Sequence, residues 1–284
     1  MTRRPALPMR VLYSALAVIV FACSVFPVYW MVNSALLPTS AVQDSTPHFW
    51  PDEFTLRNFV SVVTEPSGSI EFLPALGTSL IVTVSTVVFA LFFAFFAALA
   101  LTRFRFRSRR SLIVALLVAQ MIPAEAMIVS IFRVLDGWAL VNTVAGLTLV
   151  YVATVLPFTI WTLRGFVAGV PADLEEAAMI DGCTKSQAFW KVTFPLLAPG
   201  LVATGIFAFI QSWNEFTMAL LLMKGYNLTL PTWLNAFQSS SVAGSVDWGA
   251  VMAGSTMMAI PVIVFFLIVQ GRMTGGLVSG AVKG

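Results

Sequence analysis

The sequence contains six long stretches with almost no charged side chains, each more than 20 residues in length. A helix of about 20 residues crosses the hydrocarbon core of a bilayer, and helices satisfy their own backbone hydrogen bonds there. The predicted spans are residues 11–37, 73–101, 112–132, 138–163, 196–223 and 249–270. The sequence therefore predicts an all-α, polytopic membrane protein with six transmembrane helices.

Composition supports this fold class. Of 284 residues, 58% are hydrophobic and 10% are charged, which excludes a soluble domain with a polar surface. The first stretch follows three arginines, as in a signal peptide, but it is too long for one and is expected to remain as a span. We therefore expect a short N-terminal segment (1–10), a transmembrane domain (11–270) and a short tail (271–284).

The orientation of the spans is predicted from the distribution of basic residues, because loops rich in Lys and Arg normally face the cytoplasm. The loops on the N-terminal side hold thirteen Lys and Arg residues, whereas the other side holds Arg57, Arg133 and Lys224. This bias predicts that both termini and the loop at 164–195 are cytoplasmic. The loops at 38–71 and 224–248 are expected outside.

Five of these arginines fall between residues 103 and 110, where Phe104 and Phe106 separate some of them. Alternating basic and aromatic residues also occur in nucleic-acid-binding segments. The position between two spans and the small net charge of +3 favour an anchor at the lipid headgroups instead. We expect contact with membrane lipid and no binding of nucleic acid.

The loop at 164–195 contains the longest polar segment whose residue pattern predicts a helix. Pro171 suits the first helical position, and acidic residues follow in the first turns, where the helix dipole is positive. Gly182 is placed to end this helix in a left-handed conformation. Thr184 and Gln187 then form a capping-box pattern for a second short helix that runs towards Pro195. The pattern predicts a helix, a glycine turn and a helix.

One face of the first short helix consists mostly of small side chains. Leu174, Ala177, Ala178 and Asp181 share this face at helical spacing. Small side chains allow another surface to approach the backbone closely, so the face suits docking in a cleft. The same spacing also fits a connector that packs on its own protein, and spacing alone leaves both interpretations open.

A longer pattern in this loop resembles a known family. Glu-Ala-Ala at 176–178, Gly182 and Val-x-Phe-Pro at 192–195 resemble the EAA loop of bacterial ATP-binding-cassette importer permeases. Val192 and Phe194 are conservative departures from the Ile and Leu of that pattern. The resemblance implies a coupling helix that sits in a groove of a cytoplasmic ATPase subunit. Its expected ATPase-coupling residues are Glu175, Glu176, Ala177, Ala178, Asp181 and Gly182.

The sequence lacks the motifs of nucleotide, dinucleotide and zinc sites, and His48 is its single histidine. We therefore expect no catalytic residues, no metal site and no cofactor in this chain, which is not itself an enzyme. Two carboxylates, Glu125 and Glu215, lie within predicted spans, where ionisable residues are often functional. With Asn214 and Trp213 they are candidates for the solute path, although a structural role in helix packing also fits.

The resemblance extends over nearly the whole chain. Segments at 123–125, 156–158 and 213–216 occur in the order found in carbohydrate-importer permeases of the maltose type, in the smaller of their two membrane subunits. The C-terminal residues 276–284 also resemble the ends of sugar-importer permeases such as those for trehalose. The resemblance implies a multi-pass subunit of a bacterial plasma (inner) membrane importer for a carbohydrate.

The partners that this resemblance implies are a second permease subunit, two cytoplasmic ATPase subunits that bind ATP and Mg, and an extracytoplasmic solute-binding protein. An importer of the same superfamily for a non-sugar solute, such as glycerol phosphate, is an alternative. An ion-coupled secondary transporter is a second alternative, but it leaves the spacing of the EAA pattern unexplained and would require inverted repeats.

The thirteen-to-three distribution of basic residues generates a prediction about topology. Reporter fusions at 103–110 and 164–195 should report a cytoplasmic location, and fusions at 38–71 and 224–248 an external one. Labelling of the 164–195 loop by an impermeant reagent in intact cells would contradict this orientation.

Overall fold

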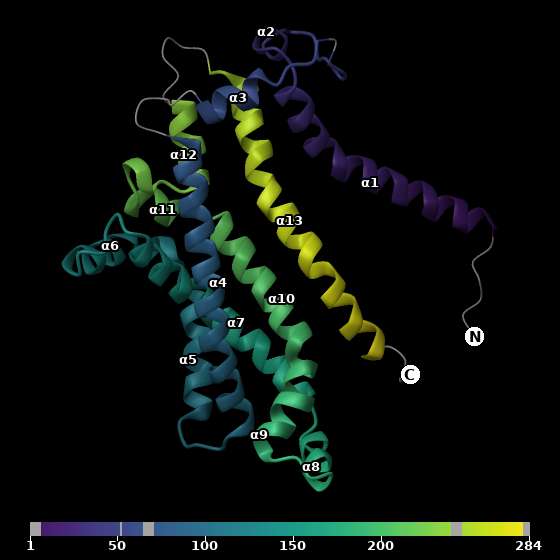
Figure 1. The fold of residues 1–284 in the computed structure, drawn as a ribbon, viewed down its shortest axis with the longest axis vertical. Helices are drawn as coiled ribbons and strands as arrows, with labels where there is room; N and C mark the ends of the chain where they lie inside the picture. The colour runs from purple at the N-terminus through teal and green to yellow at the C-terminus, as the bar shows by residue number, and fades with distance from the viewer. Residues whose placement is uncertain (1–6, 52, 65–70, 240–245, 281–284) are drawn as a thin grey trace. The chain divides into compact units, whose positions relative to one another are not determined.

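The computed structural model describes residues 7–51, 53–64, 71–239 and 246–280 (Figure 1). Within these ranges all regular structure is helical, which confirms the predicted all-α class. The chain divides into two compact units. The first consists of Met1–Phe72 with Leu234–Ile260, and the second of Leu73–Trp233 with Pro261–Gly284.

Five helical runs in the described residues are long and apolar enough to cross a bilayer. They are Met9–Ala35 in α1 (Leu7–Ala35), α4 (Phe72–Arg103), α7 (Val144–Gly169), the run Lys185–Trp213, and Trp248–Gly271 in α13 (Trp248–Gly280). A bent pair of helices, Arg109–Met121 with Ala124–Gly137, makes a sixth if it is counted as one span. This number agrees with the six predicted stretches, and the cytoplasmic location of the termini stays a prediction.

The third predicted span, residues 112–132, is not one straight helix. α5 (Arg109–Met121) ends at Ile122, whose ψ of 115° is extended, and Pro123 follows. A proline lacks an amide donor and disfavours helical geometry in the residue before it, so the helix stops here. The 3-10 turn η1 (Ala124–Met127) and α6 (Ile128–Gly137) then continue at an angle of 86° to α5.

The fourth predicted span, residues 138–163, starts too early. Ala139 and Asn142 have positive φ values of 54° and 59°, so this part of the chain is a turn. Thr143 then caps α7, because its hydroxyl oxygen accepts a hydrogen bond from the Gly146 amide at 3.0 Å. The helix continues to Gly169, beyond the predicted end at residue 163.

The fifth predicted span, residues 196–223, is displaced and interrupted. Helical structure already begins in the polar loop, as α9 (Lys185–Ala188) and the π-helical segment η2 (Phe189–Thr193), and continues as α10 (Phe194–Trp213). After α10 the chain breaks at Asn214 and forms the separate short helix α11 (Thr217–Leu222). Hydropathy locates the apolar part of a helix but not its polar extension, which explains the displaced start.

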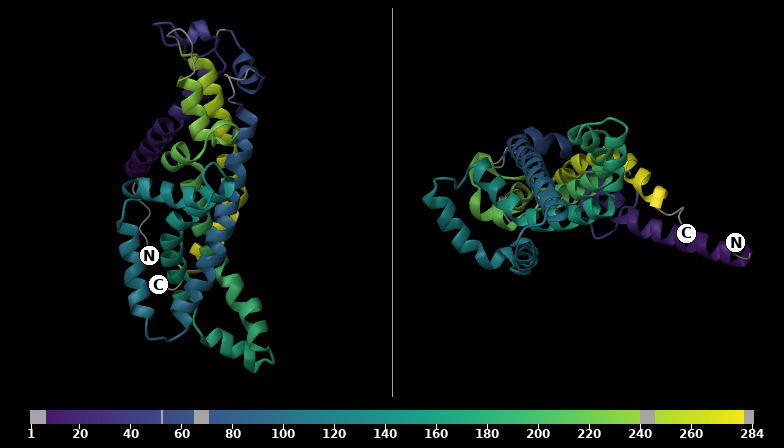
Figure 2. Two further views of the ribbon diagram at one scale, coloured as in Figure 1. Left: turned by 90° about the vertical axis from the view of Figure 1, so that its left-hand side faces the viewer. Right: turned by 90° about the horizontal axis from the view of Figure 1, so that it is seen from below.

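The core of the second unit is built by α4, α7 and α10, which run side by side (Figures 1 and 2). Fully buried alanines, Ala90 on α4 and Ala208 on α10, pack with Val155 of α7 in the middle of the bundle. Larger apolar clusters lie on both sides of this point, one of them around Leu163 and Leu197. α11 completes the other cluster, together with residues of α6.

Beyond α11 the chain forms the short turn η3 (Gly225–Asn227) and then α12 (Leu230–Ser239). The first amide of α12, that of Leu230, donates to the hydroxyl of Ser79 on α4 at 2.7 Å. A side chain of one helix therefore satisfies a free amide at the start of another.

Polar side chains that are buried or half-buried hold the first unit together. Asn58 of α3 (Arg57–Thr64) is only 4% exposed and donates to the carbonyls of Ala35 at 2.9 Å and Leu37 at 2.8 Å. Asp247 caps the start of α13 by accepting from the Ala250 amide at 3.1 Å. The hydroxyl of Thr39, in α2 (Thr39–Val42), also donates to this carboxylate, at 3.2 Å.

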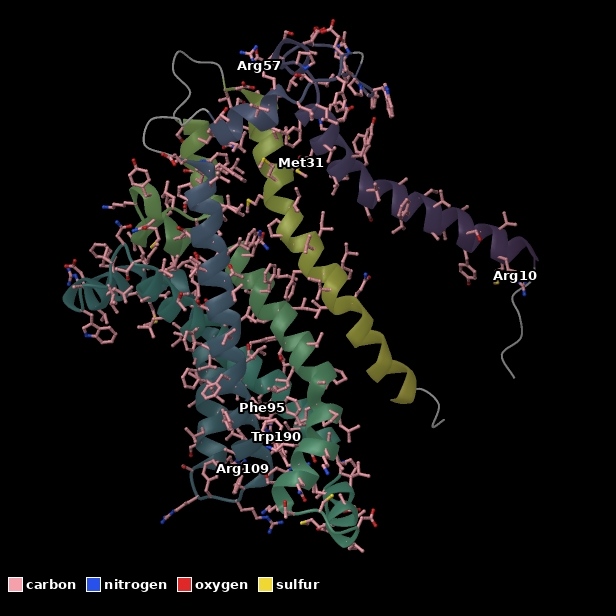
Figure 3. The ribbon with its side chains drawn as sticks, in the orientation of Figure 1. Arg10, Met31, Arg57, Phe95, Arg109 and Trp190 are labelled. Atoms are coloured by element: carbon pink, nitrogen blue, oxygen red, sulfur yellow. The ribbon has the colours of Figure 1, made fainter. Side chains whose placement is uncertain are left out.

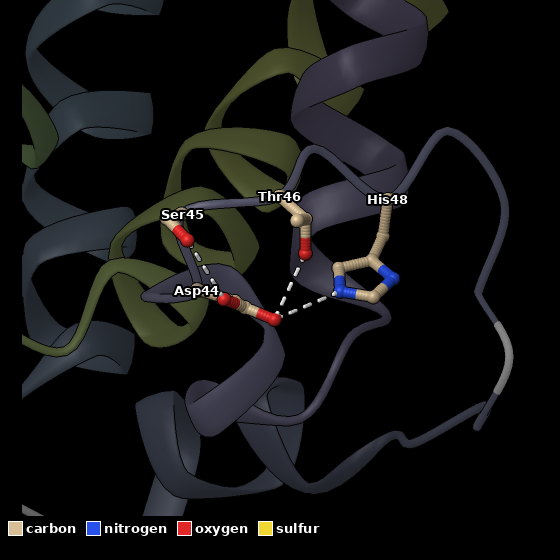
Figure 4. Close-up of polar contacts among 4 residues, drawn as sticks. All are labelled: Asp44, Ser45, Thr46 and His48. Atoms are coloured by element: carbon tan, nitrogen blue, oxygen red, sulfur yellow. Dashed lines mark hydrogen bonds and ion pairs between the residues drawn. The ribbon is translucent and has the colours of Figure 1, made fainter.

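The turn after α2 contains the single histidine of the chain (Figure 4). Asp44 accepts hydrogen bonds from the Thr46 hydroxyl at 2.9 Å and the Ser45 hydroxyl at 3.4 Å, and it lies 3.6 Å from Nε2 of His48. The hydrogen bond from Thr46 is the main cause of a lowered pKa of Asp44. Among the described residues no group of three metal-ligating side chains occurs, here or elsewhere.

The packing of α7 generates a prediction with a control on the same helix. A Cβ at Gly146 would lie 2.1 Å from the backbone oxygen of Leu140, whereas a Cβ at Gly165 would meet nothing within 4 Å. We expect Gly146→Ala to cost about 1–3 kcal/mol, because the backbone must shift. Gly165→Ala should leave stability unchanged or raise it. Thermal unfolding of the purified protein in detergent measures both, and equal melting temperatures would refute this account.

Candidate functional site

The predicted coupling segment folds as a helix, a glycine turn and a second helix, as the sequence indicates. The first helix, α8 (Asp173–Ile180), begins two residues after Pro171, so the proline precedes the helix rather than occupying its first position. Its first turn holds Asp173, Glu175 and Glu176, and it has no side-chain cap. These negative charges face the positive end of the helix dipole and stabilise the start of α8.

Gly182 ends α8 with a φ of +90°, which confirms the predicted left-handed conformation. The amide of Cys183 donates to the carbonyl of Ala178 at 3.0 Å, and that of Gly182 to the carbonyl of Met179 at 3.1 Å. This pair of bonds is typical of a helix that ends at a left-handed glycine. A Cβ at position 182 would meet no atom within 4 Å. Glycine is therefore favoured here by the left-handed backbone conformation and not by a lack of room for a side chain.

The predicted capping box is also present. The Thr184 hydroxyl accepts from the Gln187 amide at 3.3 Å, and the Gln187 side chain accepts from the Thr184 amide at 2.9 Å. From Lys185 the helix runs without interruption through η2 into α10. The second helix of the predicted coupling segment is therefore continuous with a run that is long and apolar enough to span a bilayer.

The predicted docking face of α8 is largely open. Ala177 and Asp181 are exposed, Leu174 is 41% exposed, and Ala178 is half-buried. The most exposed large apolar side chain of α8, that of Ile180 at 86%, is not part of the predicted docking face. It follows Ala177 by three positions, and this spacing was the signal that could have identified it.

Glu175 does not belong to this open surface. Its Oε1 accepts a hydrogen bond from the Thr193 hydroxyl at 2.6 Å and lies 3.4 Å from an Nη of Arg103. The neighbouring Glu176 is exposed. The carboxylate of Glu175 is therefore occupied within the chain, and its predicted part in coupling to an ATPase stays a prediction.

The two intramembrane carboxylates, which are 90 positions apart in the sequence, line one cavity of about 180 Å³. Glu125 reaches it from η1, and Glu215 from the break between α10 and α11. The remaining polar lining is uncharged and comes from α7 and α10: Tyr151, Thr154, Gln211 and Ser212. Hydropathy analysis could not pair these residues, because helix packing rather than sequence distance brings them together.

Glu215 is held by three donors. Its Oε1 accepts from the Met218 amide at 2.7 Å, and its Oε2 from the Ala219 amide at 3.1 Å and the Tyr151 hydroxyl at 2.6 Å. The carboxylate thus caps α11 and joins it to α7. This arrangement supports the structural role that the sequence left open for Glu215.

The other two path candidates lie outside the lining of this cavity. Trp213 is 2% exposed and stacks on Phe209 with ring centroids 5.7 Å apart. Asn214 is exposed, and its side-chain amide donates to the Ile210 carbonyl at 2.9 Å. Of the four predicted path residues, the structure therefore brings only Glu125 and Glu215 together.

The geometry at Glu215 generates a prediction with a matched control in the same cavity. Glu215→Gln replaces one acceptor oxygen by a donor that faces other donors, so we expect a loss of about 1–3 kcal/mol in stability. Within the described residues the exposed Glu125 carboxylate makes no hydrogen bond or ion pair, so Glu125→Gln should leave stability unchanged. Melting temperatures of the two purified variants check this difference, and equal values would exclude the capping role.

Comparison with known proteins places this architecture among transport proteins. Residues 90–274 match the model of the family described as binding-protein-dependent transport system inner membrane component. The diacetylchitobiose uptake system permease protein DasC of Streptomyces coelicolor is 45% identical, over 97% of this chain and 98% of the relative. The trehalose transport system permease protein SugB of Mycobacterium tuberculosis is 37% identical, over 96% and 97%.

The fold has a counterpart among solved structures. A chain of a bacterial importer for the acidic polysaccharide alginate superposes with a TM-score of 0.79, covering 95% of this chain and 99% of its own length. The sequence identity of 22% means that this likeness concerns the fold alone.

Proposed function

Because this chain belongs to the family of binding-protein-dependent transport system inner membrane components, we propose that it is the permease subunit of an ATP-binding-cassette importer for a carbohydrate. The observation that carries the coupling part of the proposal is the glycine-terminated helix α8. It presents an open face, and after the turn at Gly182 the chain continues as α9 and η2 into α10. A movement of α8 is therefore transmitted to α10 through this short turn.

A carbohydrate as solute is supported by two independent observations. The relatives with 45% and 37% identity are named for the uptake of diacetylchitobiose and trehalose. The cavity that contains Glu125 is lined by hydroxyl, amide and carboxylate groups, and the described residues that line it include no Lys or Arg. Such groups bind sugar hydroxyls, whereas a phosphorylated solute such as glycerol phosphate requires basic partners.

We propose the same partners that the EAA pattern implies: a second permease, two cytoplasmic ATPase subunits and an extracytoplasmic solute-binding protein. The need for a second permease is supported by the size of the cavity. Ligand pockets commonly measure roughly 300–1,000 Å³, and the cavity here measures about 180 Å³. A disaccharide would therefore need further walls from a partner.

In this mechanism the ATPase subunits bind ATP and Mg, and this chain contributes the coupling. Ile180 and Leu174 supply the apolar contact with the ATPase groove, and the small side chain of Ala177 permits close approach. When the ATPase subunits close, α8 moves with them, and the helices alternate between inward-facing and outward-facing arrangements. An ion-coupled transporter requires no docking surface for an ATPase, such as the exposed side chains of Leu174 and Ile180 would provide.

Replacement of Ile180 tests the docking surface. Ile180→Asp should weaken attachment of the ATPase subunit by about 10–100-fold, since burial of a side chain of this size contributes roughly 1.5–3 kcal/mol. Ile180→Leu keeps the apolar surface and serves as the control. The side chain at position 180 is exposed in the isolated subunit, so neither substitution should change the melting temperature. Equal retention of the ATPase by both variants after affinity purification would refute docking through this residue.

Gly182 supplies a second test, which addresses the direction of the chain after α8. Gly182→Val forces a branched side chain into a left-handed conformation, and we expect loss of ATPase attachment or of uptake. Ala178→Leu should act similarly, because added bulk at this half-buried position displaces α8. Wild-type uptake by both variants in the reconstituted complex would assign the segment to the role of a simple connector.

A further inference from the structure

We propose that Arg103, Glu175, Thr193 and the carbonyl of Val170 form a latch that locks α8 to the ends of three transmembrane helices. The Arg103 latch positions the coupling helix. Its effect on transport rests on the proposed function, whereas its effect on the order of α8 does not. Glu175 is then a positioning residue of the permease rather than a contact for the ATPase.

The latch joins elements that are far apart in the sequence. Arg103 is the last residue of α4, Glu175 lies in the first turn of α8, and Thr193 ends the π-helical segment η2. The same Arg103 nitrogen that lies 3.4 Å from Glu175 also donates to the carbonyl of Val170 at 3.1 Å, and Val170 is the C-cap of α7. One side chain thus connects α4, α7 and α8.

Partial burial makes these contacts stronger than an ordinary surface ion pair. The side chains of Arg103 and Glu175 are 23% and 20% exposed, and Thr193 is fully buried. An ion pair that is shielded from water, and whose carboxylate also accepts a hydrogen bond, is weakened less by solvent than an exposed pair. The planar guanidinium can serve a carbonyl and a carboxylate at once, which a lysine ammonium does with less fixed geometry.

Arg103 differs in this respect from the other arginines of the basic cluster. Arg105, Arg107 and Arg110 are exposed and Arg109 is half-exposed. In the described part of the chain these four make no ion pair with a carboxylate. The expected role as an anchor at the lipid headgroups therefore suits the arginines at 105–110, whereas Arg103 has a defined partner within the chain. Charge alone could not separate Arg103 from the other four in the sequence.

The π-helical segment places Thr193 for this contact. A π turn adds one residue to the helical path, which rotates the side chains that follow by about 100° relative to an uninterrupted α-helix. Aromatic side chains hold this segment against α4: the ring of Phe95 lies 6.1 Å from Phe189 and 5.8 Å from Phe194, and Trp190 lies 4.8 Å from Phe194 (Figure 3). These ring contacts hold the segment that carries Thr193, whose hydroxyl donates to Glu175.

The latch has a mechanical consequence, because α8 has non-helical backbone at both ends. Residues 170 and 171 precede its N-cap Ala172, and the left-handed Gly182 follows it. Without a side-chain contact to the bundle, a helix of eight residues could rotate about these two points. The Arg103 latch removes that freedom, so a displacement of α8 moves α4 as well as α10.

The experiment compares Glu175→Gln and Arg103→Gln with Asp173→Asn in the purified complex, with amide hydrogen exchange in residues 173–181 as the first readout. We expect the two latch variants to raise exchange rates by roughly tenfold, because α8 opens locally. Asp173→Asn removes an exposed carboxylate from the same turn and should leave exchange unchanged. Thr193→Val, which keeps the shape but removes the hydroxyl, should give an intermediate increase.

The second readout is the amount of sugar taken up per ATP hydrolysed, with retention of the ATPase subunit measured in the same preparations. Latch variants should retain the ATPase but lower this ratio, and the exchanged pair Arg103→Glu with Glu175→Arg should restore part of it. Unchanged exchange in Glu175→Gln would overturn the latch. Loss of ATPase attachment with unchanged exchange would return Glu175 to the docking surface.

These outcomes separate the latch from the proposed function. If none of the variants, including Ile180→Asp, changes retention of the ATPase subunit or sugar uptake, the proposed coupling function is wrong. The exchange measurement on α8 then still decides whether the latch exists, because it depends only on contacts within this chain.

Discussion

Inside a bilayer every backbone amide and carbonyl must find its partner within the protein, and the rest of this structure depends on that constraint. Long helices satisfy it without help. Where a helix breaks, a side chain has to supply the missing bond. The break between α10 and α11 shows this, since Glu215 accepts from two amides there and from the Tyr151 hydroxyl. A charged residue in an apolar stretch is in this case part of the backbone architecture.

The same constraint explains which features were predictable. The spans follow from hydropathy, and the turn at Gly182 and the box at Thr184 follow from local rules that involve only neighbouring residues. The bend at Pro123 and the cap at Thr143 are also local, and their residue types were informative. A search for apolar length overlooks them, because it measures composition and not hydrogen bonding.

Contacts between distant segments were the part that sequence reasoning could not supply. Glu175 and Glu176 are adjacent and chemically identical, yet one faces Arg103 and Thr193 while the other is exposed. The difference depends on the direction in which α8 leaves α7 and on the π turn before α10. Likewise, Glu125 and Glu215 line the same cavity only because the chain bends after α5 and brings η1 to α7. In both cases the packing of the helices decides which groups a carboxylate faces.

The empty space around Gly182 has a consequence for the chemistry of this position. Since a Cβ there would meet nothing within 4 Å, the site disfavours other residues by the handedness of its backbone and not by size. For a D-amino acid positive φ is the favoured region, so this conformational penalty would not apply. Glycine is the one residue among the twenty that is not chiral. The turn between α8 and α9 therefore depends on a Cα atom that carries two hydrogens and so has no handedness.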